Sequence, residues 1–407
     1  MKIEDLRDKK IALAGLGIEG KATLLFLKHF FPDKKIDVLP EDLSGQEAYE
    51  LIIRSPGIEK KRITAPSTTA TNIFFANVAS PVIGITGSKG KSTTAALVHA
   101  IFARAGRDVE LAGNIGRPML EALLAALVEK RTPLYIVELS SYQLDDIKYS
   151  PHVAVILNLF PDHMDYHGGL ANYWLAKQNI VKFGTKEDYY VYNPAYTELA
   201  DLAKNTSMQG MPFIEKLPFA DSVIPLLGTH NRDNVCAAVT IANIFKIDSA
   251  VIESAVREFK PLPHRLEYIG THKGILFYDD AISTTPESTI AAIDTLENIG
   301  TILLGGKDRG YDFSKLVEKL ATNKIPNLVF FPDGGSKIRA GLEALGSEYS
   351  PRILETKDMQ EAIKFAYAHT PAGMICLLSC ASPSYTLWKN FEEKGNAFQD
   401  AILTFEK

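Results

Sequence analysis

The sequence is poor in cysteine, with three in 407 residues. Cys236, Cys376 and Cys380 are too few and too scattered for a disulfide framework or a zinc site. Each lies among apolar residues, so we expect three small core residues in a reducing compartment.

Long hydrophobic runs and an excess of positive charge are also missing. No apolar run reaches the ~18 residues that a membrane-spanning helix needs, and the first residues do not resemble a secretory signal peptide. The net charge of −5 argues against a nucleic-acid-binding surface. Internal repeats and low-complexity tracts are absent. We therefore expect a cytoplasmic protein, a monomer, with no membrane insertion and no nucleic-acid partner.

What is present is ordinary for a globular protein, with 46% hydrophobic and 23% charged residues. A chain of this length should hold roughly two or three domains, each with its own core.

The clearest motif is Gly-Ile-Thr-Gly-Ser-Lys-Gly-Lys-Ser-Thr-Thr at residues 84–94. An apolar run at 81–83 precedes it and predicts a strand, and apolar spacing over 91–105 predicts a helix. Strand, glycine loop, Lys-Ser and helix form a phosphate cradle, in which Lys91 would reach the β/γ-phosphates and Ser92 would bind Mg²⁺. The loop is a variant of the usual pattern, and a glycine turn that binds nothing is the alternative. The predicted ATP-binding residues of this loop are Gly87, Ser88, Lys89, Gly90, Lys91, Ser92 and Thr93.

A second glycine turn, Gly15-x-Gly17-x-x-Gly20, follows a predicted strand and opens a predicted helix that runs to residue 31. Alone, this pattern is the dinucleotide fingerprint, and Asp37 lies about where a ribose would be bound. A glycine-rich first βα turn binds any diphosphate, so both NAD and a nucleotide-sugar remain open from these residues.

Several polar residues of the middle section follow predicted strands. Ligands of open α/β sheets bind beyond the carboxyl ends of strands, so Glu138 should lie near Mg²⁺, unless it is an edge residue facing solvent. His163 could ligate a metal ion or be structural, and Lys177 by spacing alone is a solvated lysine. Asn231 and Asn234 can share one helix face before an Ala-rich helix at 235–245, where their amides could read a purine or cap the helix.

The last third alternates predicted strands and helices, which indicates a doubly wound sheet. The polar strand ends Asp280, Arg309 and Ser384 should converge on one crevice. A Ser/Thr-rich stretch at 66–71 predicts a surface loop, and Pro-Leu-Pro at 261–263 predicts a stiff hinge. We expect an α/β protein of three domains: a Rossmann-like domain at 1–79, a P-loop ATPase-like domain at 80–261, and a doubly wound Rossmann-like domain at 262–407.

Taken together, the motifs resemble the Mur ligase family, the ATP-dependent amide-forming enzymes of peptidoglycan precursor synthesis. The resemblance covers essentially the whole chain. The residues that carry it are Ser-Pro-Gly-Ile at 55–58, Gly-Asn-Ile-Gly at 113–116, Glu-Leu-Ser-Ser-Tyr-Gln-Leu at 138–144, Asp-His-Met-Asp at 162–165, Leu-Pro-His-Arg at 262–265 and Lys-Asn-Phe-Glu-Glu-Lys-Gly-Asn at 389–396.

The resemblance implies a reaction and a set of roles. Its nearest pattern within the family adds D-glutamate to UDP-N-acetylmuramoyl-L-alanine through an acyl phosphate, giving ADP and phosphate, with two Mg²⁺ ions. Lys91, His163 and Lys177 would be catalytic, with Lys177 carbamylated so that it can bind metal. Ser92, Glu138, His163 and Lys177 would hold Mg²⁺. Asn231, Asn234, His264, Arg265 and Asp280 would surround the nucleotide. The substrate-binding residues would be Gly17, Ile18, Glu19 and Asn114 for the UDP-sugar, and Thr284, Arg309, Ser384 and Phe391 for glutamate.

Two stretches depart from the family pattern. Residues 280–285 read Asp-Ala-Ile-Ser-Thr-Thr where a lysine is usual at position 282, and residues 383–386 read Pro-Ser-Tyr-Thr instead of Ala-Ser-Phe/Leu-Asp. Both departures fall in the region that chooses the amino acid, so an L-glutamate-adding relative is an alternative. A folylpolyglutamate synthase-like ligase, an NAD-dependent dehydrogenase and a binding module without activity are further alternatives.

Overall fold

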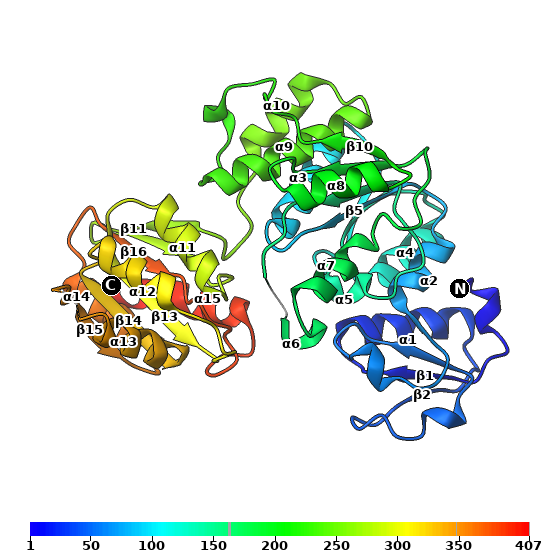
Figure 1. The fold of residues 1–407 in the computed structure, drawn as a ribbon, viewed down its shortest axis with the longest axis horizontal. Helices are drawn as coiled ribbons and strands as arrows, with labels where there is room; N and C mark the ends of the chain where they lie inside the picture. Colours follow the sequence, from blue (N-terminus) through cyan, green and yellow to red (C-terminus); the bar gives the residue numbers. More distant parts are fainter. Residues whose placement is uncertain (162–163, 347, 407) are drawn as a thin grey trace. The chain divides into compact units, whose positions relative to one another are not determined.

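The computed structural model describes residues 1–161, 164–346 and 348–406. By their internal contacts these residues form two compact units, one of Met1–Pro225 with His230–Phe259 and one of Leu226–Thr229 with Lys260–Lys407. Three largely parallel sheets of four, six and six strands are present (Figure 1). The α/β fold class predicted from the sequence is therefore confirmed, while the three predicted domain boundaries stay predictions.

The first sheet has the strand order β2-β1-β3-β4, and all its strands are parallel. The central strand β1 is completely buried because both of its faces are covered, which explains its uninterrupted apolar sequence. The elements of this region are η1 (Glu4–Leu6), β1 (Ile11–Ala14), α1 (Ile18–Phe30), β2 (Ile36–Val38), η2 (Gln46–Ala48), β3 (Leu51–Arg54), η3 (Lys60–Arg62), β4 (Ser67–Thr69) and α2 (Ala70–Asn77).

The predicted surface loop at residues 66–71 is wrong. Residues 67–69 form β4, which pairs with β3, and the Thr69 side chain accepts a hydrogen bond from the Asn72 N–H and caps α2. Thr68, Thr69 and Thr71 are buried. Threonine is common both in strands and at helix N-caps, and burial decided between these roles and a loop.

The second sheet has the order β10-β9-β8-β5-β7-β6, also all parallel. One apolar cluster packs α4 and α8 on one face, and a second packs α3, α9 and α10 on the other. The elements are β5 (Val82–Thr86), α3 (Lys91–Arg104), β6 (Val109–Gly113), α4 (Met119–Glu129), β7 (Leu134–Glu138), α5 (Ser141–Leu144), β8 (Val153–Ile156), α6 (Met164–His167), α7 (Leu170–Gln178), β9 (Tyr189–Tyr192), α8 (Thr197–Asn205), β10 (Gln209–Pro212), η4 (Asp221–Val223), α9 (Thr229–Ile244) and α10 (Ser249–Glu258).

Helices α1 and α2 of the first sheet both pack against α4 of the second. One buried apolar cluster therefore runs from the first sheet into one face of the second. Helix α9 starts at Thr229, six residues earlier than the predicted helix, so Asn231 and Asn234 lie within the helix.

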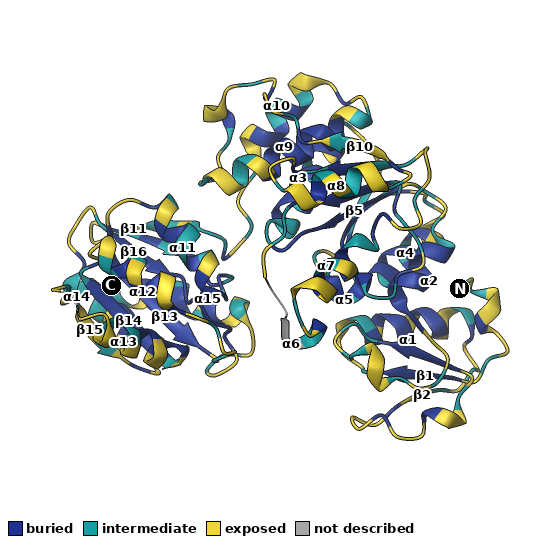
Figure 2. Cartoon of the chain, viewed as in Figure 1, coloured by how far each residue is buried: buried dark blue, intermediate teal, exposed yellow. Residues whose placement is uncertain are grey.

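The third sheet has the order β11-β12-β16-β13-β14-β15, in which only β11 is antiparallel to its neighbour. Along β13, Ile302 and Leu304 pack against α11, α12 and α13, whereas Leu303 packs against α14 and α15 on the other face. The predicted doubly wound arrangement is thus present, with buried strands between helices whose outer sides are exposed (Figure 2). The elements are β11 (Glu267–His272), β12 (Ile275–Asp279), α11 (Pro286–Thr295), β13 (Ile299–Gly306), α12 (Ser314–Thr322), β14 (Asn327–Asp333), α13 (Gly334–Ala344), β15 (Arg352–Glu355), α14 (Met359–His369), β16 (Ile375–Leu378) and α15 (Phe391–Glu406).

All three cysteines are buried, as predicted from their apolar neighbours. Burial raises the pKa of the Cys376 and Cys380 thiols, so both are protonated core residues. Within the described ranges no helix has the length and apolar character needed to cross a membrane.

Candidate active site

The glycine loop joins β5 to α3, which is the predicted strand–loop–helix layout. Gly90, directly before the helix, has a φ of +83°, and a Cβ at this position would lie 2.3 Å from Oδ1 of Asn234. Only glycine fits here, because a side chain would be strained and would also collide with a buried amide. Gly90 caps α3 without a side-chain hydrogen bond, and helix N-termini of this kind can bind anions.

Residues that follow β8 form hydrogen bonds to the glycine loop. The Lys89 N–H donates to Oδ1 of Asn158 (2.9 Å), whose own amide donates back to the Lys89 carbonyl (3.0 Å). The Ser88 hydroxyl lies 2.8 Å from the Phe160 carbonyl and 2.9 Å from the Tyr173 hydroxyl. Ser88 and Lys89, both predicted to bind ATP, thus also hold the loop in shape. Sequence reasoning gave Asn158 and Tyr173 no role, although the position of Asn158 at a strand end could have suggested one.

Two lysine ammonium groups meet on one carbonyl of this loop. Lys91 Nζ donates to the carbonyls of Gly87 and Ser88, each at 3.0 Å. Lys177 Nζ, from α7, donates to the same Gly87 carbonyl at 2.9 Å and to Oγ1 of Thr86 at 3.3 Å. The Lys177 side chain is 1% exposed, so it is not the solvated lysine that its spacing alone suggested. Lys91 from α3 and Lys177 from α7 therefore both reach the same turn of the phosphate loop.

The first turn of α3 carries Ser92 and Thr93 at the same edge of the sheet. The next residue, Thr94, donates through its hydroxyl to Oδ1 of Asn234 (3.2 Å), and the Asn234 amide donates to Oδ1 of Asn231 (2.9 Å). Asn234 is 3% exposed. The two asparagines share a helix face as predicted, and Asn234 braces the phosphate loop in this structure.

Glu138 ends β7, the strand beside β5, and is paired in register with Ile85. Its side chain is 3% exposed, and its Oε2 has no hydrogen-bond partner among the described residues. A buried carboxylate oxygen without a partner is costly unless a ligand completes it. A hard cation such as Mg²⁺ fits this donor, and Ser92 and a carbamylated Lys177 would supply further oxygen ligands.

Asn114, the first residue after β6, lies next to Glu138 because its N–H donates to the Glu138 carbonyl at 3.1 Å. The preceding Gly113 is required there, because a Cβ would lie 2.2 Å from the same oxygen. Asn114 is exposed and therefore accessible to a substrate. His163, the third predicted metal ligand, lies outside the described residues.

The first glycine turn leaves the N-terminus of α1 open. Gly15 has a φ of +89°, and no atom lies within 4 Å of a Cβ built on Gly17. Ile18 is 81% exposed although it is apolar, which suits a surface that a ligand covers. Glu19 accepts a hydrogen bond from the Gln143 amide (3.3 Å), and burial raises the pKa of Glu19 to about 7.

Asp37, the candidate ribose ligand of a dinucleotide site, already interacts with two neighbouring side chains. It accepts a hydrogen bond from the Tyr49 hydroxyl (3.1 Å) and pairs with Lys35 (3.1 Å).

In the second compact unit the predicted nucleotide residues lie at the end of β12. Asp280 is 4% exposed, and burial raises its pKa to about 6 while the Ser379 hydroxyl donates to it at 2.8 Å. His264 lies 2.7 Å from the Asp279 carboxylate, and this hydrogen bond raises the pKa of His264. Arg265 follows it directly. The Phe391 ring, predicted to contact glutamate, packs edge-on against His264 with ring centres 6.1 Å apart.

The predicted glutamate residues lie on three loops that leave neighbouring strands. Thr284 follows β12, Arg309 follows β13 and Ser384 follows β16, and these strands are adjacent in the sheet. The last two loops are tied together, because the Lys307 N–H donates to the Pro383 carbonyl at 2.8 Å. Ser384 is 3% exposed and its hydroxyl has no partner among the described residues. The predicted convergence of strand ends is therefore seen within this unit.

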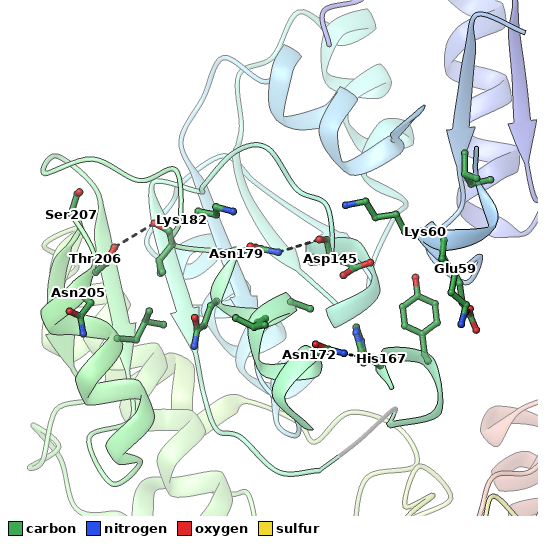
Figure 3. Close-up of a pocket in the computed structure, with 18 residues that line it drawn as sticks. Glu59, Lys60, Asp145, His167, Asn172, Asn179, Lys182, Asn205, Thr206 and Ser207 are labelled. Atoms are coloured by element: carbon green, nitrogen blue, oxygen red, sulfur yellow. Dashed lines mark hydrogen bonds and ion pairs between the residues drawn. The ribbon is translucent and has the colours of Figure 1, made fainter. Parts of the chain in front are cut away.

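A large hollow of about 1060 Å³ lies elsewhere, between η3, α7 and α8 (Figure 3). Lys91, Ser92, Glu138 and Lys177 do not line it. Two side-chain amides that line this hollow donate hydrogen bonds to backbone carbonyls: Asn172 to His167 (2.9 Å) and Asn179 to Leu144 (3.0 Å). The chemistry-bearing residues thus gather at the strand ends and not in this hollow.

The fold and the phosphate loop define a multidomain α/β nucleotide-binding protein. Comparison with known proteins narrows this class. The family model described as the Mur ligase middle domain matches residues 85–223, and that described as the Mur ligase, glutamate ligase domain matches residues 264–382. The chain belongs to the Mur ligase family, whose members are ATP- and Mg²⁺-dependent ligases of peptidoglycan precursor synthesis.

Full-length relatives carry two different names. A Salinispora tropica protein named UDP-N-acetylmuramoyl-L-alanine--L-glutamate ligase is 32% identical over 99% of both chains. A Streptococcus mutans protein named UDP-N-acetylmuramoylalanine--D-glutamate ligase is 33% identical over 99% of this chain and 98% of its own. Among solved structures, MurF ligase from Thermotoga maritima in complex with ADP has a TM-score of 0.65 at 14% identity, covering 99% of this chain and 97% of its own, and shares the fold.

Proposed function

We propose that this protein joins glutamate to the free carboxyl group of UDP-N-acetylmuramoyl-L-alanine and consumes ATP in doing so. The observation that carries the proposal is the loop between β5 and α3, where Lys91 Nζ lies 3.0 Å from the Gly87 and Ser88 carbonyls and the buried Glu138 ends the neighbouring strand. A lysine at the head of a helix suits the polyphosphate of ATP, and a buried carboxylate beside it suits Mg²⁺. The matches to full-length glutamate-adding ligases support the two organic substrates.

The chemistry follows from the need to activate a carboxylate. A carboxylate oxygen of the UDP-sugar attacks the γ-phosphorus of ATP, ADP leaves, and an acyl phosphate forms. The glutamate amine then attacks the carbonyl carbon, loses a proton, and inorganic phosphate departs. Lys91 would bind the transferring phosphoryl group, and Mg²⁺ on Ser92, Glu138 and Lys177 would neutralise the developing charge.

A carbamate on Lys177 is part of this proposal. As an ammonium, Lys177 repels both Lys91 and Mg²⁺. Addition of CO₂ to the neutral amine, with loss of a proton, converts it to an anionic oxygen ligand that attracts both. This would explain why a lysine lies beside the phosphate loop with 1% of its side chain exposed.

We further propose L-glutamate as the amino acid. Relatives with L- and D-glutamate names match over nearly the whole chain with similar identity, but the departures at residues 282 and 383–386 lie where the sequence predicts the amino-acid site. The family resemblance alone favours D-glutamate and leaves L-glutamate as the alternative, so this proposal exchanges the two. A folylpolyglutamate synthase is disfavoured by the additional sheet that precedes the phosphate loop.

Release of inorganic phosphate is the test. The purified protein receives Mg·ATP, UDP-N-acetylmuramoyl-L-alanine and either L- or D-glutamate, and the products are identified by mass spectrometry. We expect release that needs both organic substrates and is faster with L-glutamate, and a Lys91→Met variant should be inactive. Faster reaction with D-glutamate would overturn the choice of acceptor alone. No release with either amino acid would overturn the proposed function.

A further inference from the structure

The amino-acid loops carry an aromatic contact that the proposed site does not yet use. The Arg309 guanidinium carbon lies 5.8 Å from the centre of the Tyr385 ring, within the range of a cation–π contact. The two residues come from loops after β13 and β16, which are adjacent strands. The tyrosine therefore acts on the one arginine that is predicted to bind a glutamate carboxylate.

The contact restrains a mobile group without occupying its donors. Arg309 and Tyr385 are both exposed, and an exposed arginine samples many rotamers. Contact with a ring face engages the plane of the guanidinium and leaves its N–H fork at the edge. The fork remains able to bind a carboxylate with two hydrogen bonds, and its position is now fixed.

Both sides of the contact are anchored to the same helix start. Next to Tyr385, the Thr386 hydroxyl donates to Oδ2 of Asp333, the residue before α13 (2.9 Å). Next to Arg309, Asp308 pairs with Lys337 of α13 at 2.5 Å. The tyrosine and the arginine are thus held by a common support, which makes their separation a property of the fold and not of two independent loops.

A third group lies beside this pair. Ser384, the neighbour of Tyr385, has a buried hydroxyl without a partner among the described residues. A dicarboxylic amino acid offers two carboxylates whose spacing depends on its side-chain length. A fixed distance between the Arg309 guanidinium and the Ser384 hydroxyl therefore selects the amino acid whose two carboxylates are far enough apart to reach both groups.

We infer that Tyr385 is a specificity-determining residue, which positions the Arg309 guanidinium so that glutamate, and not the shorter aspartate, is accepted. The inference rests on the proposed function, because it concerns the amino acid that the ligase adds. Tyr385 itself is a positioning residue that acts through Arg309. It should therefore affect glutamate binding and selectivity without changing the handling of ATP or of the UDP-sugar.

The test compares Tyr385→Leu with Tyr385→Phe in the full-length protein. Leucine removes the ring and keeps apolar bulk, whereas phenylalanine keeps the ring. For Tyr385→Leu we expect the KM for glutamate to rise about two- to fivefold, the effect of losing an exposed cation–π contact. The kcat and the KM for ATP should stay the same, and the preference for glutamate over aspartate in kcat/KM should narrow. Tyr385→Phe should resemble the wild type.

Two controls show whether the effect passes through the Arg309 guanidinium or comes from a general loss of exposed aromatic surface. Tyr268→Leu removes a tyrosine of similar exposure from β11 and should change none of these constants. In an Arg309→Ala background, Tyr385→Leu should add no further loss, because the tyrosine acts through the arginine.

The outcomes are distinguishable. A wild-type protein without glutamate-dependent phosphate release would overturn the proposed function together with this inference. An active wild type whose Tyr385→Leu variant keeps the same glutamate KM and selectivity would overturn the inference alone. So would a full additional loss in the Arg309→Ala background.

Discussion

Replacing Lys177 by methionine tests the proposed carbamate most directly. Methionine keeps the length and much of the volume of the buried side chain, but it has no charge and cannot bind CO₂. Because Lys91 and Lys177 share the Gly87 carbonyl, their two nitrogens can be no more than about 6 Å apart. At an effective dielectric constant of about 20, two unit charges at this separation interact by about 3 kcal/mol.

The sign of that interaction depends on the chemical state of Lys177. As an ammonium it opposes Lys91 by about 3 kcal/mol, and as a carbamate it attracts Lys91 by a similar amount. Lys177→Met removes the attraction from the active form, so kcat/KM for ATP should fall by about two orders of magnitude. Phosphate release with both organic substrates measures this loss. Acetate or propionate should restore part of the activity by placing a carboxylate in the vacated space.

The carbamate also has a signature independent of turnover. Protein equilibrated with ¹³C-bicarbonate should give a carbamate carbon resonance that is missing in Lys177→Met. Lys182→Met serves as the matched control, because Lys182 is exposed and lies one turn beyond the end of α7. It should keep wild-type kinetics. If the wild type gives no carbamate resonance and carboxylic acids do not rescue Lys177→Met, Lys177 acts as a cation and the reasoning fails.

Three further variants test the structural basis of the site. Because the pKa of Glu19 is raised, its contribution to stability is present below the unfolded pKa of ~4.5 and is lost as the pH rises to about 7. Glu19→Gln should therefore increase the free energy of unfolding at pH 8 by up to about 3 kcal/mol and change it little near pH 4.5, as measured by urea denaturation. Gly90→Ala should abolish ATP binding in calorimetry, because its Cβ meets a buried amide, whereas Gly106→Ala at the other end of α3, with open space around it, should bind ATP like the wild type. Arg54→Met should lower the free energy of unfolding by about 3–5 kcal/mol, since it leaves Asp146 without its buried partner at 3.0 Å, and unchanged thermal stability would contradict this.

The parts of the fold that sequence reasoning predicted well are those with strong local patterns. The β5–α3 unit was found because apolar runs, glycines and a Lys-Ser pair occur within about a dozen residues. In the last third, the apolar run at 275–280 predicts a strand and the spacing over 286–296 predicts a helix, each only one residue longer than the observed β12 and α11. Residues 66–71 were missed because three of them are threonines, which are compatible with a loop, a strand or a helix cap. Only pairing with β3 and burial decide among these, and both are long-range effects.

The same distinction applies to the site. Lys91, Ser92 and Glu138 lie on or next to recognisable strand ends, so their chemistry could be assigned from position in the sequence. Asn158 and Tyr173 were missed as supports of the loop because their partners are about 70 and 85 residues away. Lys177 could be given a role only through the family resemblance, since helical spacing predicted a solvated side chain.

The arrangement of charge at the phosphate loop explains why such residues cannot be read from local sequence. Lys177 on α7 reaches the loop because β5 and β8 are neighbours in the sheet and Phe160, after β8, accepts a hydrogen bond from the Ser88 hydroxyl. The Tyr173 ring, one turn before Lys177, lies 4.7 Å from its ammonium and holds it against the loop. The Lys177–Gly87 hydrogen bond joins residues 90 positions apart, so the sequence around Lys177 cannot predict it.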